Sequence, residues 1–113
     1  MKMIQAIIRR EKLGDVKNAL DAIKCPGVMI WEILGHGKQK GVTEQFRGRE
    51  FKVDLLPKTK IEIVAHDAQV KSIVDTIIKA ANTHKIGDGK IFIIPVENAI
   101  RIRTGDVGDV AVD

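Results

Sequence analysis

The chain has 113 residues, of which 44% are hydrophobic and 30% charged, with a net charge of +4. These values predict one globular domain with one core and exclude a disordered chain. No apolar run approaches the roughly 20 residues that cross a bilayer, and no secretory signal is visible. Cys25 is the single cysteine, which excludes an intrachain disulfide. We therefore expect a reducing, cytoplasmic location.

The first part of the chain predicts a strand, a helix and a second strand. The isoleucine-rich run at 3–9 is typical of a strand. Apolar residues then recur every three or four positions over 11–24, which predicts an amphipathic helix that the Pro-Gly pair at 26–27 ends. The apolar run at 28–34 is too short for a helix and predicts the second strand.

The stretch 36–55 follows this strand and shows no sustained apolar period. Its base, 35–41, reads Gly-His-Gly-Lys-Gln-Lys-Gly, and these glycines let the backbone turn sharply. A long charged loop inside a compact domain indicates function rather than a missed element. We therefore predict a single domain, 1–113, with a regulatory loop that changes shape and is bound by another molecule.

The second part of the chain predicts a strand, a helix and another strand. Residues 58–66 alternate between apolar and polar side chains, and the apolar stripe over 70–81 predicts the most regular helix of the chain. Asp67 suits the N-cap of that helix. A glycine-bearing loop at 83–90 then leads to a strand over 91–96.

The C-terminal segment, 101–113, overlaps a short fifth strand that alternation over 99–104 predicts. We expect the acidic tail after Gly105 to be mobile. The order strand, helix, strand, strand, helix, strand is that of the ferredoxin-like βαββαβ fold, an antiparallel four-stranded α+β sheet with two helices on one face. The other face also carries apolar side chains, so we expect it to pack on another subunit.

Two basic segments are candidate anion sites, and the positive net charge favours an anionic partner. In 85–90, two glycines can turn N–H groups toward an anion, although an ordinary turn is the simpler explanation of this loop alone. Arg101 and Arg103 would lie side by side on a strand and suit phosphate oxygens, with a solvated basic edge as the alternative. An antiparallel return could bring Lys90 close to Arg101.

A third candidate is the base of the long loop, 37–41. Its N–H groups and the Gln39 amide could bind a carboxylate or help to ligate magnesium held by phosphates, although a flexible loop is the simpler explanation. The three histidines and Cys25 lack the spacing of metal ligands. No nucleophile or acid–base pair stands out, so we do not expect an enzyme.

Five blocks of sequence, in matching order and spacing, resemble the nitrogen-regulatory PII signal-transduction family over essentially the whole chain. They are Gly35–Gly41, Thr43-Glu44 with Phe46-Arg47-Gly48, Leu56-Pro57-Lys58, Thr83–Phe92 and Ile100–Gly105. The resemblance implies a homotrimer that binds ATP or ADP competitively in clefts between subunits.

By this match, the residues that hold the phosphates would be Gly87, Asp88, Gly89, Lys90, Arg101 and Arg103, with Lys38 helping. Those that line the nucleotide cleft would be Gly37, Glu62 and Val64. With Mg-ATP bound, 2-oxoglutarate would contact Gln39, Lys40, Gly41, Lys58 and Gly87, and Gln39 would complete the magnesium shell. A ligand that favours one loop state would then change the affinity for targets.

The resemblance also implies partners for the long loop. An ammonium transporter, whose pore Arg47 would plug, is the foremost target, and glutamine synthetase or a nitrogenase regulator remains open. Contact with a membrane would occur only through the transporter, and no nucleic-acid partner is implied.

Four positions depart from many relatives. Phe51 replaces a tyrosine that is uridylylated in bacterial members, and a ring without a hydroxyl cannot accept UMP, so we expect no uridylylation. Arg49 replaces a serine that some relatives phosphorylate. Lys38 stands where many have arginine, and Met29 stands where a small hydroxyl residue often meets the adenine.

Two other functions stay open. RNA-recognition domains share this strand order, so an RNA-binding ferredoxin-like module is the alternative, but it needs exposed aromatic residues on the sheet, and two of the four aromatics lie in the long loop. A slow ATPase is conceivable, although no catalytic base is identifiable.

Overall fold

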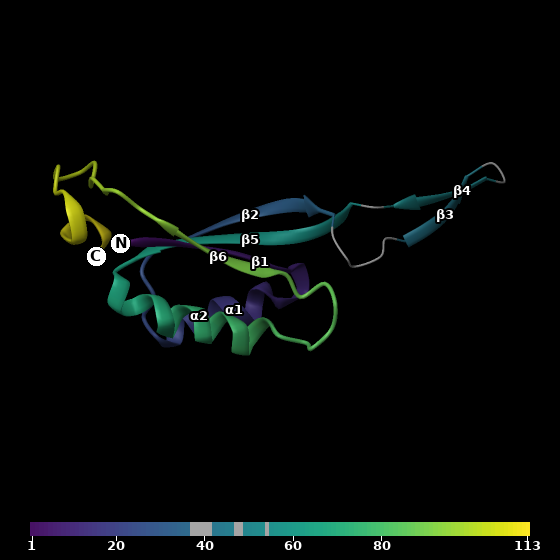
Figure 1. The fold of residues 1–113 in the computed structure, drawn as a ribbon, viewed down its shortest axis with the longest axis horizontal. Helices are drawn as coiled ribbons and strands as arrows, with labels where there is room; N and C mark the ends of the chain where they lie inside the picture. Colours follow the sequence, from purple (N-terminus) through teal and green to yellow (C-terminus); the bar gives the residue numbers. More distant parts are fainter. Residues whose placement is uncertain (37–41, 47–48, 54) are drawn as a thin grey trace.

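The computed structural model describes residues 1–36, 42–46, 49–53 and 55–113, with 42–46 and 49–53 described as backbone only. Four strands form one antiparallel sheet in the order β2-β5-β1-β6. They are β1 (Lys2–Arg9), β2 (Val28–Gly35), β5 (Leu56–Ala65) and β6 (Lys90–Pro95). Both long helices, α1 (Leu13–Ala22) and α2 (Asp67–Ala81), lie on one face of this sheet (Figure 1). The predicted ferredoxin-like fold is confirmed.

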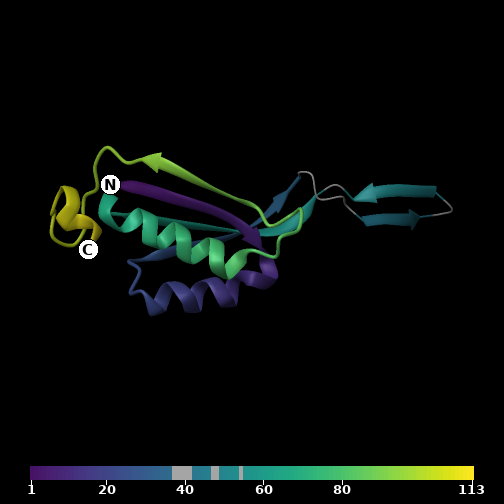
Figure 2. The ribbon, with the colours of Figure 1, turned by 60° about the horizontal axis from the view of Figure 1, so that its bottom comes forward.

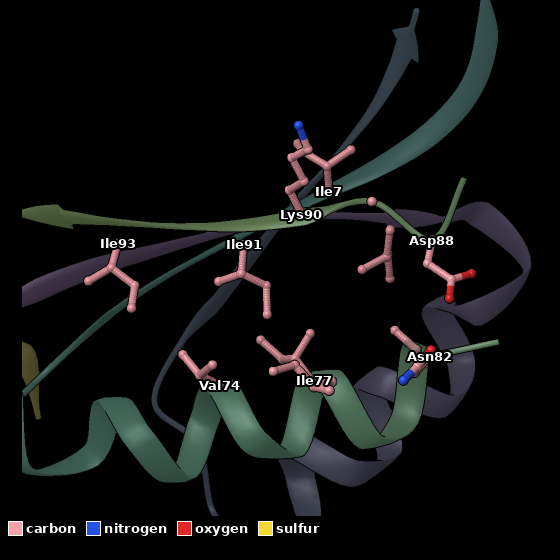
Figure 3. Close-up of a pocket in the computed structure, with 12 residues that line it drawn as sticks. Ile7, Val74, Ile77, Asn82, Asp88, Lys90, Ile91 and Ile93 are labelled. Carbon is pink, nitrogen blue, oxygen red and sulfur yellow. The ribbon is translucent and has the colours of Figure 1, made fainter. Parts of the chain in front are cut away.

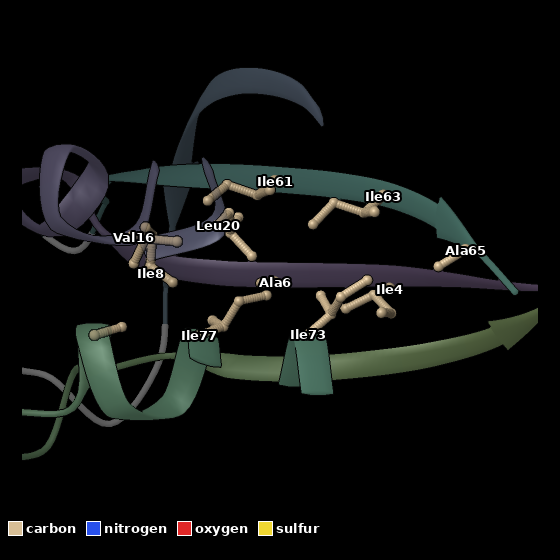
Figure 4. Close-up of a cluster of buried hydrophobic side chains, with 11 residues drawn as sticks. Ile4, Ala6, Ile8, Val16, Leu20, Ile61, Ile63, Ala65, Ile73 and Ile77 are labelled. Atoms are coloured by element: carbon tan, nitrogen blue, oxygen red, sulfur yellow. The ribbon is translucent and has the colours of Figure 1, made fainter. Parts of the chain in front are cut away.

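The core lies between this sheet face and the two helices. Strand side chains alternate between faces and helical side chains repeat every three or four residues, so both patterns direct apolar groups into one layer. Figure 4 shows these side chains converging, and each fully buried isoleucine or leucine contributes roughly 1.5–3 kcal/mol. The core residues that are at most 2% exposed include Ile4, Ala6, Ile8, Val16, Leu20, Ile61, Ile63, Ile73 and Ile77.

The opposite face of the sheet is not covered by any element of the described chain. It carries apolar groups at both edges, because Met29 and Trp31 on β2 and Phe92 and Ile94 on β6 are between 36% and 48% exposed. The ammonium of Lys60 lies 4.7 Å from the centre of the Trp31 ring. The expectation that a second subunit covers this face stays a prediction.

The end of α1 differs from its sequence-based prediction. A 3-10 turn (Arg10–Lys12) precedes the helix, which ends at Ala22 and so before the Pro-Gly pair. Lys24 adopts a left-handed conformation, with φ of 55°. Its N–H donates to the Asp21 carbonyl, and the Cys25 N–H donates to the Leu20 carbonyl. This hydrogen-bond pattern, a Schellman motif, terminates the helix.

The start of α2 also differs. The N-cap residue is His66, so the prediction that Asp67 occupies this position is wrong. Asp67 is the first helical residue, and its carboxylate instead lies 3.0 Å from the N-terminal ammonium. No helix in the described part of the chain is long and apolar enough to cross a membrane.

The predicted long loop contains a hairpin that its polar sequence did not reveal. Strands β3 (Val42–Phe46) and β4 (Arg49–Val53) pair antiparallel in a separate two-stranded ribbon (Figure 2). The site residues predicted in this stretch lie outside the described residues or, as side chains, are not described. They are Gly37, Lys38, Gln39, Lys40, Gly41 and Arg47.

The predicted fifth strand over 99–104 is wrong. Ile100 forms only an isolated bridge with Val107, and the chain turns back between them. The turn is closed by the Gly105 N–H, which donates to the Arg101 carbonyl at 2.7 Å. The tail expected to be mobile forms a short 3-10 helix, η2 (Gly108–Val112).

Candidate functional site

A pocket of about 550 Å³ lies where the loop at 83–90, here called the glycine loop, meets the start of the long loop. Its lining includes three lysines, Lys58, Lys85 and Lys90, together with the glycines of the loop. Lys90 pairs with Ile7 across the sheet, on the face opposite the helices. The fold therefore brings together the glycine loop and Lys58, two predicted site elements that are distant in the sequence.

The conformation of the loop depends on its glycines. Gly87 and Gly89 have φ values of 105° and 95°, which other residues rarely adopt. At Gly89 there is also no space, because a Cβ atom would lie 1.7 Å from the carbonyl oxygen of Ile7. The loop backbone thus packs directly on β1.

Lys58 anchors the middle of the loop. Its Nζ donates a hydrogen bond of 2.7 Å to the Gly87 carbonyl. Burial lowers the pKa of Lys58, and the nearby Arg9 guanidinium lowers it further, while Glu11 and Asp88 act in the opposite direction. A partly desolvated ammonium next to a second cation favours an anionic ligand in this pocket.

Asp88 is held by two residues. Arg9 donates through Nε to Asp88 Oδ1 at 2.9 Å and through Nη2 to the Ile86 carbonyl at 2.8 Å. Thr83 donates its N–H to Asp88 Oδ2 at 2.7 Å and its hydroxyl to Oδ1. The hydrogen bonds from Thr83 and Arg9 outweigh partial burial and hold the pKa of Asp88 well below its ordinary value. The Asp88 carboxylate therefore stabilises the conformation of the loop itself.

A second hollow, of about 440 Å³, lies between β6 and α2 (Figure 3). Val74 and Ile77 face Ile91 and Ile93 across it, while the amine of Lys90 points away from the helix. Because aliphatic side chains dominate this lining, it offers few groups that could hold an anion. The pocket with the three lysines is the better candidate site.

The two predicted arginines lie far from this pocket within the chain. Strand β6 runs the length of the sheet from Lys90 to Pro95, and Arg101 and Arg103 follow it in the C-terminal segment, at the opposite end (Figures 1 and 2). The prediction that an antiparallel return brings Lys90 and Arg101 together within one chain is therefore wrong.

The arginines also differ from each other. Arg101 donates to Asp106 Oδ2 at 2.9 Å and, through Nη2, to the carbonyls of Val110 and Asp113 at 2.7 and 3.0 Å. Arg103 is exposed and makes no hydrogen bond or ion pair with the residues that the structure describes. The pairing of the two guanidinium groups along a strand, expected from their spacing, is not present.

The family model described as Nitrogen regulatory protein P-II matches residues 1–106. The chain belongs to this family. It is 57% identical over 112 residues to Nitrogen regulatory protein P-II 2 of Methanothermobacter thermautotrophicus, covering 99% of this chain and 97% of that protein. It is 54% identical to Nitrogen regulatory protein P-II of Cereibacter sphaeroides and to P-II 1 of Escherichia coli K12, covering 99% of this chain and 100% of each. The resemblance inferred from five sequence blocks is confirmed.

In this P-II chain, the predicted cleft residues on β5 lie on the open sheet face. Glu62 pairs across the sheet with Met29, and Val64 follows two residues later. Gln5 donates to Glu62 Oε1 at 3.1 Å, and the Lys60 ammonium lies 3.3 Å from the same oxygen. The carboxylate of Glu62 is thus held in place on the face where Met29 is exposed.

The residues of this candidate site that were not identified from the sequence include Ile7, Arg9 and Thr83. Arg9 lies 79 positions from Asp88, so no local spacing could connect them. Ile7 contributes a backbone carbonyl, which every residue type has, so the sequence could not indicate it. The described residues contain no group of three or more His, Cys, Asp or Glu side chains that could hold a metal ion.

Proposed function

We propose that this P-II protein binds ATP or ADP competitively, binds 2-oxoglutarate together with Mg-ATP, and regulates a target through its long loop. The observation that carries the proposal is the division of the site residues into two sets at opposite ends of each chain. One set is the glycine loop with Lys58 and Lys90, and the other is the C-terminal segment with Arg101 and Arg103.

Neighbouring subunits of a homotrimer could join these two sets into one cleft. The open sheet face supports such an assembly, since Trp31 and Phe92 stay half exposed in a single chain and large apolar patches favour association. We therefore propose three nucleotide sites, one at each interface between subunits. Sedimentation should give a trimer, and a monomer at micromolar concentration would contradict the proposal.

The pocket suits nucleotide phosphates. Its volume lies within the range of small-molecule sites, and it combines glycine N–H groups with the charge of Lys90. Such donors bind phosphate oxygens, and the charge of Asp88, which also lines the pocket, is balanced by Arg9. Magnesium would be held mainly by the phosphates, with Gln39, which lies outside the described residues, completing its shell.

2-Oxoglutarate would bind beside Lys58, at the base of the long loop. The Lys58 ammonium suits a carboxylate of this dianion, and the proposed remaining contacts are Gln39, Lys40, Gly41 and Gly87. Calorimetry should show clear binding of 2-oxoglutarate with Mg-ATP and little without nucleotide. Equal affinity in both conditions would contradict the proposed order of binding.

We propose an ammonium transporter as the first target, with glutamine synthetase or a nitrogenase regulator as alternatives. Pull-down from membranes should depend on whether ADP, ATP, or Mg-ATP with 2-oxoglutarate is present. Arg47→Ala should abolish capture if this residue plugs the pore, whereas Arg49→Ala, which removes the same charge two residues away, should weaken it only slightly. Equal losses would argue against a plug.

Regulation would rest on ligands alone, without uridylylation, because Phe51 has no hydroxyl. Incubation with a uridylyltransferase and UTP should leave the protein unlabelled, and Phe51→Tyr should make labelling possible. Labelling of the unaltered chain would contradict this. Since the proposed ligands are metabolites of the cell interior, we also propose a cytoplasmic location, and we propose no catalytic role.

RNA binding is the second candidate function. One observation favours it, namely the exposure of Trp31 and Phe92 on the open sheet face, where RNA-recognition domains stack bases. A salt-sensitive mobility shift with single-stranded RNA, lost in Trp31→Ala, would support this function. A trimer that buries both aromatic rings would exclude it.

A further inference from the structure

We propose that Arg9 is a positioning residue of the nucleotide site, which holds the glycine loop so that its N–H groups face a phosphate. The inference rests on the proposed nucleotide binding and adds to it a residue at the end of β1. Arg9 need not contact the ligand, because both of its acceptors belong to the loop itself.

The first step concerns the direction of two carbonyl groups. Arg9 binds the carbonyl of Ile86, and Lys58 binds the carbonyl of Gly87. Arg9 and Lys58 are partners across β1 and β5, so the two side chains start from neighbouring positions on one face of the sheet. The two consecutive carbonyls are therefore both turned toward the same cationic pair.

The second step follows from peptide geometry. In a trans peptide, the carbonyl of one residue and the N–H of the next point in opposite directions, and the described chain has no cis peptide. The N–H groups of Gly87 and Asp88 therefore point away from the heads of Arg9 and Lys58. Successive N–H groups that face one way form a binding site for an anion.

The third step explains the carboxylate beside this site. An unpaired Asp88 would repel a phosphate, yet its charge is balanced by Arg9, in an ion pair whose side chains are 15% and 21% exposed. Thr83 donates hydrogen bonds to both oxygens of this carboxylate. The Asp88 side chain thus helps to shape the loop, while its backbone N–H is the group that would hold a phosphate.

The fourth step explains why the residue is arginine. Its planar guanidinium binds the Asp88 carboxylate through Nε and the Ile86 carbonyl through Nη2 at the same time. A lysine ammonium at this position would keep the charge but not this fixed two-pronged geometry. Removal of Arg9 frees the Ile86 carbonyl and leaves Asp88 without its cation.

The test is calorimetric titration of the full-length protein with ADP. Arg9→Gln should weaken ADP binding by roughly tenfold or more, because a loop that is no longer preorganised must be ordered on binding. Arg10→Gln is the matched control: it removes the same charge from the next residue, which is exposed, and should change the affinity by less than about threefold. Arg9→Lys should fall between the two.

The Asp88→Asn variant tests whether this carboxylate strengthens or weakens ADP binding. If this carboxylate only repelled the phosphates, its neutralisation would strengthen ADP binding, whereas loss of the loop anchor should weaken it. Amide exchange at Gly87 and Gly89 without nucleotide should become faster in both Arg9→Gln and Asp88→Asn. If Arg9→Gln does not fold, Arg9→Lys supports the same comparison.

Equal ADP affinities for Arg9→Gln and Arg10→Gln, or tighter binding by Asp88→Asn, would overturn the positioning role while leaving nucleotide binding intact. Failure of the unaltered protein to bind ADP at millimolar concentration would instead overturn the proposed function, and with it the role of Arg9.

Discussion

At both ends of the sheet cationic side chains bind backbone carbonyls, but the donors left for a ligand differ. At the glycine loop, Arg9 and Lys58 bind protein carbonyls and so turn N–H groups outward. At the C-terminal end, Arg101 binds Asp106 and two carbonyls of the same segment, so most of its own donors already have acceptors within the protein. One half of the proposed site is preformed, and the other must exchange internal partners for phosphate.

This exchange requires little energy. The Asp106 side chain is 41% exposed, and ion pairs near the surface contribute only about 0–1 kcal/mol. A phosphate could therefore replace Asp106 at Arg101 without unfolding the segment. Nucleotide affinity should then depend more on the glycine loop than on the arginine end, and the following predictions test this difference.

The largest effect is expected for Gly89→Ala. The new Cβ would meet the Ile7 carbonyl oxygen at a position with φ of 95°, so we expect a loss of roughly 2–4 kcal/mol in the free energy of unfolding and no detectable ADP binding. Gly14→Ala is the control, since nothing lies within 4 Å of its Cβ, and this exposed helical site should gain about 0.5–1 kcal/mol. Urea denaturation measures both. Near-equal stabilities would show that the loop backbone can move away from β1.

The next effect compares Arg101→Ala with Arg103→Ala. Both should weaken ADP binding by about tenfold, the effect of losing a charged hydrogen bond to phosphate. Only Arg101→Ala should also speed hydrogen exchange over 108–112, because only Arg101 bonds to that segment. Faster exchange in Arg103→Ala to the same extent would refute the difference between the two arginines.

A smaller effect concerns pH and the C-terminal end. His66 lies 2.5 Å from Asp113 and 3.7 Å from Asp109, and the hydrogen bond with Asp113 raises the pKa of His66 above its ordinary value of 6.5. Asp67, the next residue on α2, also interacts electrostatically with His66, and its carboxylate pairs with the N-terminal ammonium. Stabilisation by protonated His66 should be complete below pH 6.5 and be lost as the pH rises through the raised value.

Hydrogen exchange over 108–112 between pH 5 and 9 tests this, after correction for intrinsic rates. His66→Gln should remove the pH dependence, and His84→Gln, at the other end of the sheet, should leave it unchanged. A pH dependence that persists in His66→Gln would assign it to another group.

The smallest effect lies outside both ends of the sheet. Lys24→Gly should raise the free energy of unfolding by about 0.5–1 kcal/mol, because glycine adopts the left-handed conformation of this helix end without strain. Lys17→Gly, at an exposed site inside α1, should lower it by about 1 kcal/mol. Both variants should bind ADP like the unaltered chain. A change in affinity would show that stability, rather than local geometry, controls the site.

Most of the fold was predictable from the sequence because its strands and helices have regular apolar periods. The hairpin of β3 and β4 was missed because its sequence has no sustained apolar period, and it forms a two-stranded sheet of its own. The segment 99–104 was wrongly predicted to be a strand for the opposite reason. Its alternation is strict, but Ile102 is fully exposed and no neighbouring strand receives it.

The candidate site was predictable only in part. The glycine loop and the arginines stand out by composition, and the resemblance to the P-II family predicts that they bind one ligand. Their separation within the chain depends on the length of β6, and the anchoring of Asp88 by Arg9 spans 79 positions. Neither leaves a local pattern in the sequence.

Mixed trimers test most directly whether two subunits share one nucleotide site. Lys90→Ala removes one cation at the glycine-loop end and Arg103→Ala removes one at the other end, so the proposed trimer of either variant alone should bind ADP weakly. After denaturation and joint refolding of equal amounts, about a quarter of the interfaces should combine two unaltered halves and bind ADP as tightly as the unaltered protein. A mixture that binds no better than its components would place the whole site within one chain and contradict the shared cleft.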